Sequence, residues 1–168
     1  MHLARIAPFL VVAGLCIGCD HATKVAAVSL LGSRPPIEMA GGIVRFELAY
    51  NPGAFLSLGA GLPTALRTAI FGWLVPLGVV AASIFFLRDK TLGAAALVAL
   101  GLLAGGGLSN GIDRMLHAGF VTDFVSLGIG SLRTGIFNVA DLAVIAGVLG
   151  ILWAGAVATP DDVPPASS

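Results

Sequence analysis

Charged residues are scarce in this sequence, at 11% of the chain, whereas about 25% is typical of a soluble domain. Hydrophobic residues make up 57% of the chain, and the mean hydropathy is +0.99. This composition excludes an ordinary soluble domain and predicts a membrane protein. The formal net charge is zero, so no basic surface suggests nucleic acid as a partner.

Cysteine is rarer still, with Cys16 and Cys19 the only two. Their C-x-x-C spacing is compatible with a redox pair or half of a zinc site, but no βαβ pattern and no second ligand pair follows. We therefore expect both to pack as small apolar side chains. The surrounding "VVAGLCIGCDHATK" also resembles a lipobox, but Cys16 stands where an aliphatic residue is usual and more apolar spans follow. We interpret that match as a coincidence.

Motifs of several enzyme classes are missing as well. The chain has no H-E-x-x-H zinc-protease motif, and its three histidines are scattered. The glycine-rich "GLLAGGGLSNG" lacks the lysine of a P-loop and predicts helix packing followed by a turn. We expect neither a metal nor an organic cofactor.

Long apolar runs, by contrast, are abundant. A hydrocarbon core of about 30 Å requires about 20 apolar residues as a helix. Four such windows occur, at about 6–28, 68–87, 92–108 and 136–157. We predict an all-α membrane protein with four transmembrane helices, whose glycine and alanine residues allow close helix contacts.

The connections between these spans differ in length. The segment 32–66 is long, and its "GGIVRFELAY" alternates in a way that predicts a short strand or hairpin outside the hydrocarbon. "RDK" at 88–90 predicts a tight turn, and 109–135 a longer connection. We expect one domain over 1–158 and a disordered tail over 159–168, which is rich in Pro and Ser.

Orientation follows from positive charge in the short connections. Arg5, Arg88 and Lys90 share one side with both termini, which the positive-inside rule makes cytoplasmic. The opposite side receives the arginines at positions 34, 45, 67, 114 and 133. The prediction therefore rests on charge density in the very short connections.

Polar stretches gather on the opposite side of the membrane. Ionisable residues inside or at the edge of a span are costly, and they are candidates for a functional site. Four alternating spans bring together "DHATK" (20–24), "NPGAFLS" (51–57), "NGIDR" (110–114), "VTDF" (121–124) and "FNVAD" (137–141).

Helical spacing groups several of these side chains. Asp20 and Lys24 are i,i+4 with the acid first, the favourable order for an ion pair. Asn110, Asp113 and Arg114 fall at i, i+3 and i+4, which predicts one shared face. Asp20 with Lys24, and Asp113 with Arg114, are equally compatible with satisfied pairs that hold the helices together.

Asp123 and Asp141 differ, because neither has a cation at helical spacing on the candidate face. Asn138 precedes Asp141 at i,i+3. Two carboxylates that meet at a membrane edge do not both ionise cheaply, so one holds a proton, as in the aspartic proteases. Sequence separation alone leaves open whether these two meet.

In these five ordered stretches, over nearly the whole chain, the sequence resembles the lipoprotein signal peptidases, or signal peptidase II, which are integral-membrane aspartic peptidases of bacteria. The resemblance implies four membrane helices, both termini cytoplasmic, and a small extracytoplasmic β-rich segment between helices 1 and 2. It implies a location in the bacterial inner membrane with the active site near the extracytoplasmic face.

The resemblance also implies roles for individual residues. It makes Asp123 and Asp141 the catalytic dyad. The residues that it implies line or brace the active site are Asn51, Gly53, Asn110, Asp113, Arg114, Asn138, Ala140, Asp20 and Lys24. The implied substrate is a prolipoprotein with diacylglycerol on its lipobox cysteine, cut on the N-terminal side of that cysteine. Membrane lipid is the other expected partner, and we expect a monomer.

The sequence departs from the family pattern at a few positions. His21 stands where Gln is usual, and Phe55 and Leu56 stand where Ala and Phe are expected. Ser109 and Gly111 replace residues that are more often Gly and Leu. These departures bear on the shape of the pocket rather than on the reaction.

Two other functions are compatible with the residues. In a small transporter or channel subunit, Asp20, Lys24, Asp113 and Asp141 would form a proton or ion relay, although the sequence shows no internal repeat. In a purely structural membrane subunit the same groups would only hold the helices together. Activity of the isolated chain separates the peptidase from both.

Overall fold

The computed structural model describes residues 3–53 and 59–157. Four of its helical stretches are long and apolar enough to cross a membrane, which confirms the predicted class. They are α1 (Leu3–Leu31), a continuous second stretch (Thr64–Arg88), α4 (Ala94–Leu116) and α5 (Val139–Val157). The second stretch consists of α2 (Thr64–Arg67), the π-helix η3 (Thr68–Leu74) and α3 (Val75–Arg88). The predicted disordered tail lies outside the described residues.

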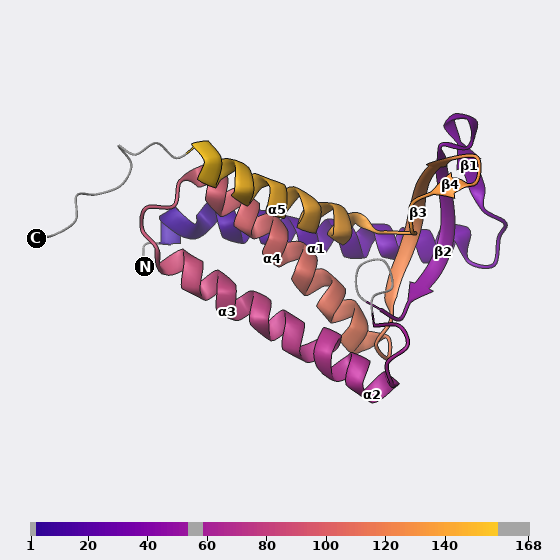
Figure 1. The fold of residues 1–168 in the computed structure, drawn as a ribbon, viewed down its shortest axis with the longest axis horizontal. Helices are drawn as coiled ribbons and strands as arrows, with labels where there is room; N and C mark the ends of the chain where they lie inside the picture. The colour runs from indigo at the N-terminus through magenta and orange to yellow at the C-terminus, as the bar shows by residue number, and fades with distance from the viewer. Residues whose placement is uncertain (1–2, 54–58, 158–168) are drawn as a thin grey trace, which may run out of the picture.

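The helices run side by side, and a small sheet lies across one end of them (Figure 1). Helix α4 is central and packs against α1, α5 and α3. The start of α1, the end of α5 and the α3–α4 turn share the end opposite the sheet. Arg5 Nη1 donates to the Leu87 carbonyl at 3.1 Å, which places the two predicted basic segments together.

Small residues let α4 approach its neighbours closely. A Cβ atom added at Gly105 would lie 2.7 Å from Cys16 Cβ on α1, and one at Gly147 would lie 2.8 Å from the Ala99 carbonyl oxygen on α4. Such distances are too short for a side chain, so these glycines are required for the helix contacts. Cys16 is buried at this contact and Cys19 is exposed, both as free thiols.

The sheet has four antiparallel strands in the order β1-β2-β3-β4. Strands β1 (Ile37–Met39) and β2 (Val44–Asn51) come from the segment predicted to be β-rich. Strands β3 (Val121–Ile129) and β4 (Leu132–Arg133) come from the α4–α5 connection, where the sequence predicted none. Ala49 pairs with Asp123 in the β2–β3 register, which brings two of the polar stretches together.

Helix α4 extends about two turns beyond its predicted end at residue 108. The predicted connection from residue 109 was therefore too long, and the observed one starts at His117. The extra turns carry Asn110, Asp113 and Arg114, whose polar groups find partners inside the protein. A polar helix end is stable there because these partners replace water.

Candidate active site

Lys24 lies at the centre of a buried polar cluster between α1 and α4. Its Nζ atom is 2.6 Å from Asp20 Oδ2 and 3.0 Å from Asp113 Oδ2, and it donates to Asn110 Oδ1 at 3.0 Å. An ammonium group has three hydrogens, so these acceptors match its donors in number. Lys24 is 4% exposed and Asp20 is fully buried. The predicted Asp20–Lys24 pair is confirmed.

The alternative pairing of Asp113 with Arg114 is wrong. Asp113 pairs with Lys24, whereas Arg114 donates to the carbonyl oxygens of Asn110 and Gly53, at 3.1 and 2.6 Å. Successive residues on a helix do not face each other, so the two side chains meet different neighbours. The predicted single polar face of "NGIDR" is therefore two faces, one toward α1 and one toward a cavity.

Both carboxylates of the Lys24 cluster also accept backbone N–H groups. Asp20 Oδ1 accepts from the Ala140 amide at 2.9 Å, and its Oδ2 accepts from Ser109 Oγ at 2.7 Å. Asp113 Oδ2 accepts from the Thr122 amide at 2.9 Å. Each of these amides belongs to the residue just before one of the two candidate catalytic aspartates. The cluster therefore fixes the start of α5 and the start of β3 relative to α1 and α4.

Asp141 lies in the first turn of α5. Its Oδ2 accepts from the Asn138 amide at 3.2 Å, and its own amide donates to Asn138 Oδ1 at 2.9 Å. This reciprocal pair is a capping box, which satisfies two N–H groups at the helix start. Asn110 Nδ2 donates to the other oxygen, Oδ1, at 2.9 Å. Asp141 is therefore held by donors on both oxygens.

Asp123 is on β3 and is 1% exposed. Asn51 Nδ2 donates to its Oδ2 at 3.0 Å, and Asn138 Nδ2 donates to its Oδ1 at 2.7 Å. Burial raises the pKa of Asp123 to about 7, and the nearby charge of Asp141 adds to the rise, while the two amide hydrogen bonds oppose it. Asn138 contacts both aspartates and so links them.

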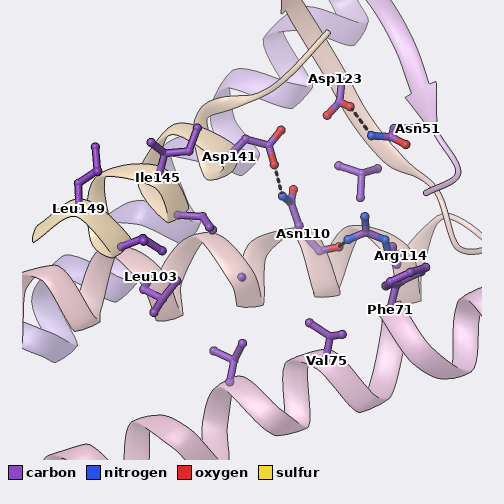
Figure 2. A pocket seen from close by; sticks show the side chains of 15 residues that line it. Asn51, Phe71, Val75, Leu103, Asn110, Arg114, Asp123, Asp141, Ile145 and Leu149 are labelled. Carbon is purple, nitrogen blue, oxygen red and sulfur yellow. Dashed lines mark hydrogen bonds between the residues drawn. The ribbon is translucent and has the colours of Figure 1, made fainter. Parts of the chain in front are cut away.

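The two aspartates, which the sequence could not bring together, face one cavity (Figure 2). Its volume is about 580 Å³. Asn51, Asn110 and Arg114 line the same end, from β2 and α4. The other end is apolar and extends along α3, α4 and α5, through Val75, Val79, Leu103, Val144, Ile145, Val148 and Leu149. Two carboxyl groups at the polar end of an apolar cavity are suited to acid–base catalysis on a substrate with an apolar part.

Arg114 adds a fixed positive charge to this end. It is 8% exposed, and its Nη2 donates to the Gly53 carbonyl at 2.6 Å. The Gly53 amide in turn donates to Asn51 Oδ1 at 2.9 Å. Asn51 therefore connects Asp123 to the backbone on which Arg114 is anchored. The polar end of the cavity therefore carries two carboxyl groups, from Asp123 and Asp141. It also carries the side-chain amides of Asn51 and Asn110 and the guanidinium of Arg114.

A comparison with known protein families decides the family. The family model described as Signal peptidase (SPase) II matches residues 12–157. This chain belongs to the signal peptidase II family. Lipoprotein signal peptidases of Rhodococcus jostii and Methylocella silvestris are each 35% identical to it, over 88% and 84% of this chain and 71% and 81% of theirs. The resemblance found in the motifs is confirmed, and the transporter alternative is not favoured.

Solved structures agree with this fold. Two bacterial membrane enzymes superpose on this signal peptidase II with TM-scores of 0.75 and 0.74, at 22% and 25% sequence identity. The matches cover 95% and 90% of this chain and 94% of each of theirs. The protein is therefore a multi-pass membrane protease of the signal peptidase II type.

Several residues around this signal peptidase II site were not predicted as site residues. Thr122 contributes a backbone amide, and Phe71 lines the cavity as an aromatic residue inside an apolar span, where the sequence gives no signal. Ser109 was noticed only as a departure from the family pattern. Phe55 and Leu56 lie outside the described residues. Within 3–53 and 59–157, no group of three or more His, Cys, Asp or Glu side chains could hold a metal ion.

Proposed function

We propose that this signal peptidase II hydrolyses the peptide bond before the diacylglyceryl-modified cysteine of prolipoproteins and releases the signal peptide. The observation that carries the proposal is the meeting of Asp123, from β3, and Asp141, from α5, at the polar end of an apolar cavity. The names of the relatives, lipoprotein signal peptidases, support the substrate class. The two carboxylates support the aspartic type that we propose.

The reaction requires one water between the two carboxylates. The ionised aspartate takes a proton from this water, and the water oxygen attacks the carbonyl carbon that precedes the lipidated cysteine. The protonated aspartate stabilises the oxygen of the tetrahedral centre with its O–H group. The C–N bond then breaks as a proton passes to the leaving amine of the cysteine. Burial and the nearby charge of Asp141 raise the pKa of Asp123 to about 7, so the pair of carboxylates holds one shared proton below neutral pH.

Arg114 orients groups and does not transfer protons, because a guanidinium stays protonated. Its bonds to the carbonyls of Gly53 and Asn110 hold its plane fixed beside the aspartates. Asn51 and Asn110 each donate to one aspartate, so they set the direction of the carboxylate oxygens. In this proposal the three side chains align the scissile carbonyl with the water.

The apolar part of the cavity is the proposed place for the lipid portion of the substrate. The lining continues from the polar end along the helices, with Val75 on one side and Ile145 and Leu149 on the other (Figure 2). The eight residue-to-residue steps from Asp141 to Leu149 rise about 12 Å along a helix. Acyl chains held there would place the scissile bond next to the two carboxylates.

The orientation in the membrane is also part of the proposal. Arg5 and Arg88 lie at the end of the bundle opposite the sheet. We place that end, with both termini, in the cytoplasm, and the sheet and the aspartates at the extracytoplasmic face of the bacterial inner membrane. Water is available there for hydrolysis, while the lipid portion of the substrate stays in the bilayer.

Cleavage should slow as the pH rises above about 7. Because the pKa of Asp123 is raised to about 7, this carboxyl is protonated below that pH and ionised above it. Loss of the shared proton leaves two like charges and no acid, so kcat/KM, which reports the titration of the free enzyme, falls toward tenfold per pH unit on the alkaline side. The measurement is kcat/KM from pH 5.5 to 9, with the exposed Asp89→Asn variant as the control that keeps the same profile. A flat profile from pH 6 to 9 would contradict this assignment.

The proposal is tested with purified protein in nanodiscs and two forms of one prolipoprotein, with and without diacylglycerol on the lipobox cysteine. Release of the signal peptide is followed by mass spectrometry. We expect cleavage of the lipidated form on the N-terminal side of the cysteine, and at least about a hundredfold slower cleavage of the other. Equal rates would remove lipid recognition from the proposal, and no cleavage of either would overturn it.

A further inference from the structure

The second membrane span begins with an unusual helix. Between α2 and α3, residues Thr68–Leu74 form a π-helix of seven residues. π-Helical turns are rare and often occur at functional sites. This one carries Phe71, whose side chain faces the cavity beside Arg114 (Figure 2). Trp73, an aromatic residue of the same π-helix, is 56% exposed on the outside of the bundle. Apolar character alone therefore does not explain why the Phe71 side chain faces the cavity.

The ring of Phe71 covers one face of the Arg114 guanidinium. The centroid of the ring is 5.8 Å from Arg114 Cζ, within the range of a cation–π contact. The Nη groups of Arg114 are directed to the carbonyls of Gly53 and Asn110. Arg114 Nε is buried and has no hydrogen-bond partner within the described residues. The position of the guanidinium therefore depends on the two carbonyls and on this ring.

Contacts on the other side hold the ring in place. Gly59 has a φ of +76°, and a Cβ atom there would lie 2.9 Å from Phe71 Cε2. Only glycine both adopts this backbone conformation without strain and leaves room for the ring. A second cation–π contact, of Arg67 with the Phe120 ring at 5.4 Å, joins the same span to the segment after α4. The start of the second span is thus attached at two points, at Arg67 in α2 and at Phe71 in the π-helix.

We propose that Phe71 is a positioning residue of this peptidase. Its ring keeps the Arg114 guanidinium in the orientation that meets the substrate carbonyl, and it forms part of the cavity wall beside Arg114. This inference rests on the proposed function. Its physical content is electrostatic: the negative face of the ring, more than its volume, is what Arg114 requires.

The test replaces Phe71 by 4-fluoro-, 3,5-difluoro- and 3,4,5-trifluorophenylalanine. Fluorine withdraws charge from the ring face and changes its size little, so the cation–π contact weakens in steps while the packing stays. We expect kcat on the lipidated prolipoprotein to fall in steps, by about tenfold for the trifluoro ring, with KM within about twofold. The same series at Phe9, a buried aromatic in the contact between α1 and α4, should leave kcat unchanged.

A second measurement does not depend on turnover. Arg114 Cζ is 5.8 Å from the centroid of the Phe71 ring, and Nε is bonded to Cζ. We therefore expect the NMR signal of the Nε–H proton in arginine-labelled protein to be shifted upfield by the ring and to move back in Phe71→Leu. Three results would each overturn the role of Phe71. They are a kcat that stays within twofold along the Phe71 series, an equal loss of kcat along the Phe9 series, and an Nε–H signal that does not move in Phe71→Leu. Absence of cleavage in the wild type would instead overturn the proposed function, and the NMR shift would still decide the Phe71 contact.

Discussion

Replacing Asp123 or Asp141 by Asn should lower the rate of prolipoprotein cleavage by at least about a thousandfold in each case. An amide neither takes a proton from water nor gives one to the leaving amine, and general acid–base catalysis is worth about a hundredfold to ten-thousandfold per group. The two groups act on one water in one cavity, so each loss should be nearly complete. The measurement is the initial rate of signal-peptide release from lipidated substrate.

The design of this experiment separates chemistry from folding. Asn has almost the same size as Asp, so the cavity keeps its shape, and the melting temperature in detergent reports whether the fold persists. Asp89→Asn is the matched control, since Asp89 is exposed in the α3–α4 turn at the far end of the molecule. Either dyad variant retaining more than a tenth of the normal rate, with a normal melting temperature, would contradict the assignment.

The part of this fold that the sequence predicts is local. Four spans follow from the length of the apolar runs, and the Asp20–Lys24 pair follows from helical spacing, because both depend on neighbours along the chain. The bond between Asn51 and Asp123 joins residues 72 positions apart. It depends on the pairing of β2 with β3, and the pattern of "VTDFVSLGI" does not specify its partner strand.

The incorrect pairing of Asp113 with Arg114 has a related cause. Helical spacing shows only approximately which residues share a helix face. The hydrogen-bond or ion-pair partner of each side chain depends on which groups the neighbouring elements place next to it. Lys24 on α1 already faces Asp113, so Arg114 is left to turn toward Gly53 and the cavity. Phe71 illustrates the same limit for apolar residues, because hydropathy does not distinguish a cavity wall from a surface that faces lipid.

Replacing Lys24 by Met should destabilise the protein strongly. The substitution removes the ammonium that contacts Asp20 and Asp113, whose side chains are 0% and 2% exposed, and leaves two buried carboxylates close together. Removal of one partner from a buried ion pair costs about 3–5 kcal/mol. We expect the melting temperature in detergent to fall on the order of 10 °C. Lys90→Met, at an exposed position in the α3–α4 turn, is the matched control and should change it little.

A second substitution tests whether charge is the cause. Adding Asp20→Asn to Lys24→Met removes one of the two uncompensated carboxylates, so part of the lost stability should return. Cleavage should stay low in both variants, because both lack the Lys24 ammonium, which donates to Asn110 Oδ1 and so holds the Asn110 amide oriented toward Asp141. If the double variant were less stable than Lys24→Met alone, hydrogen bonding by Asp20 would outweigh its charge. A normal melting temperature for Lys24→Met would contradict the claim that the Lys24 cluster fixes β3 and α5 around the two aspartates.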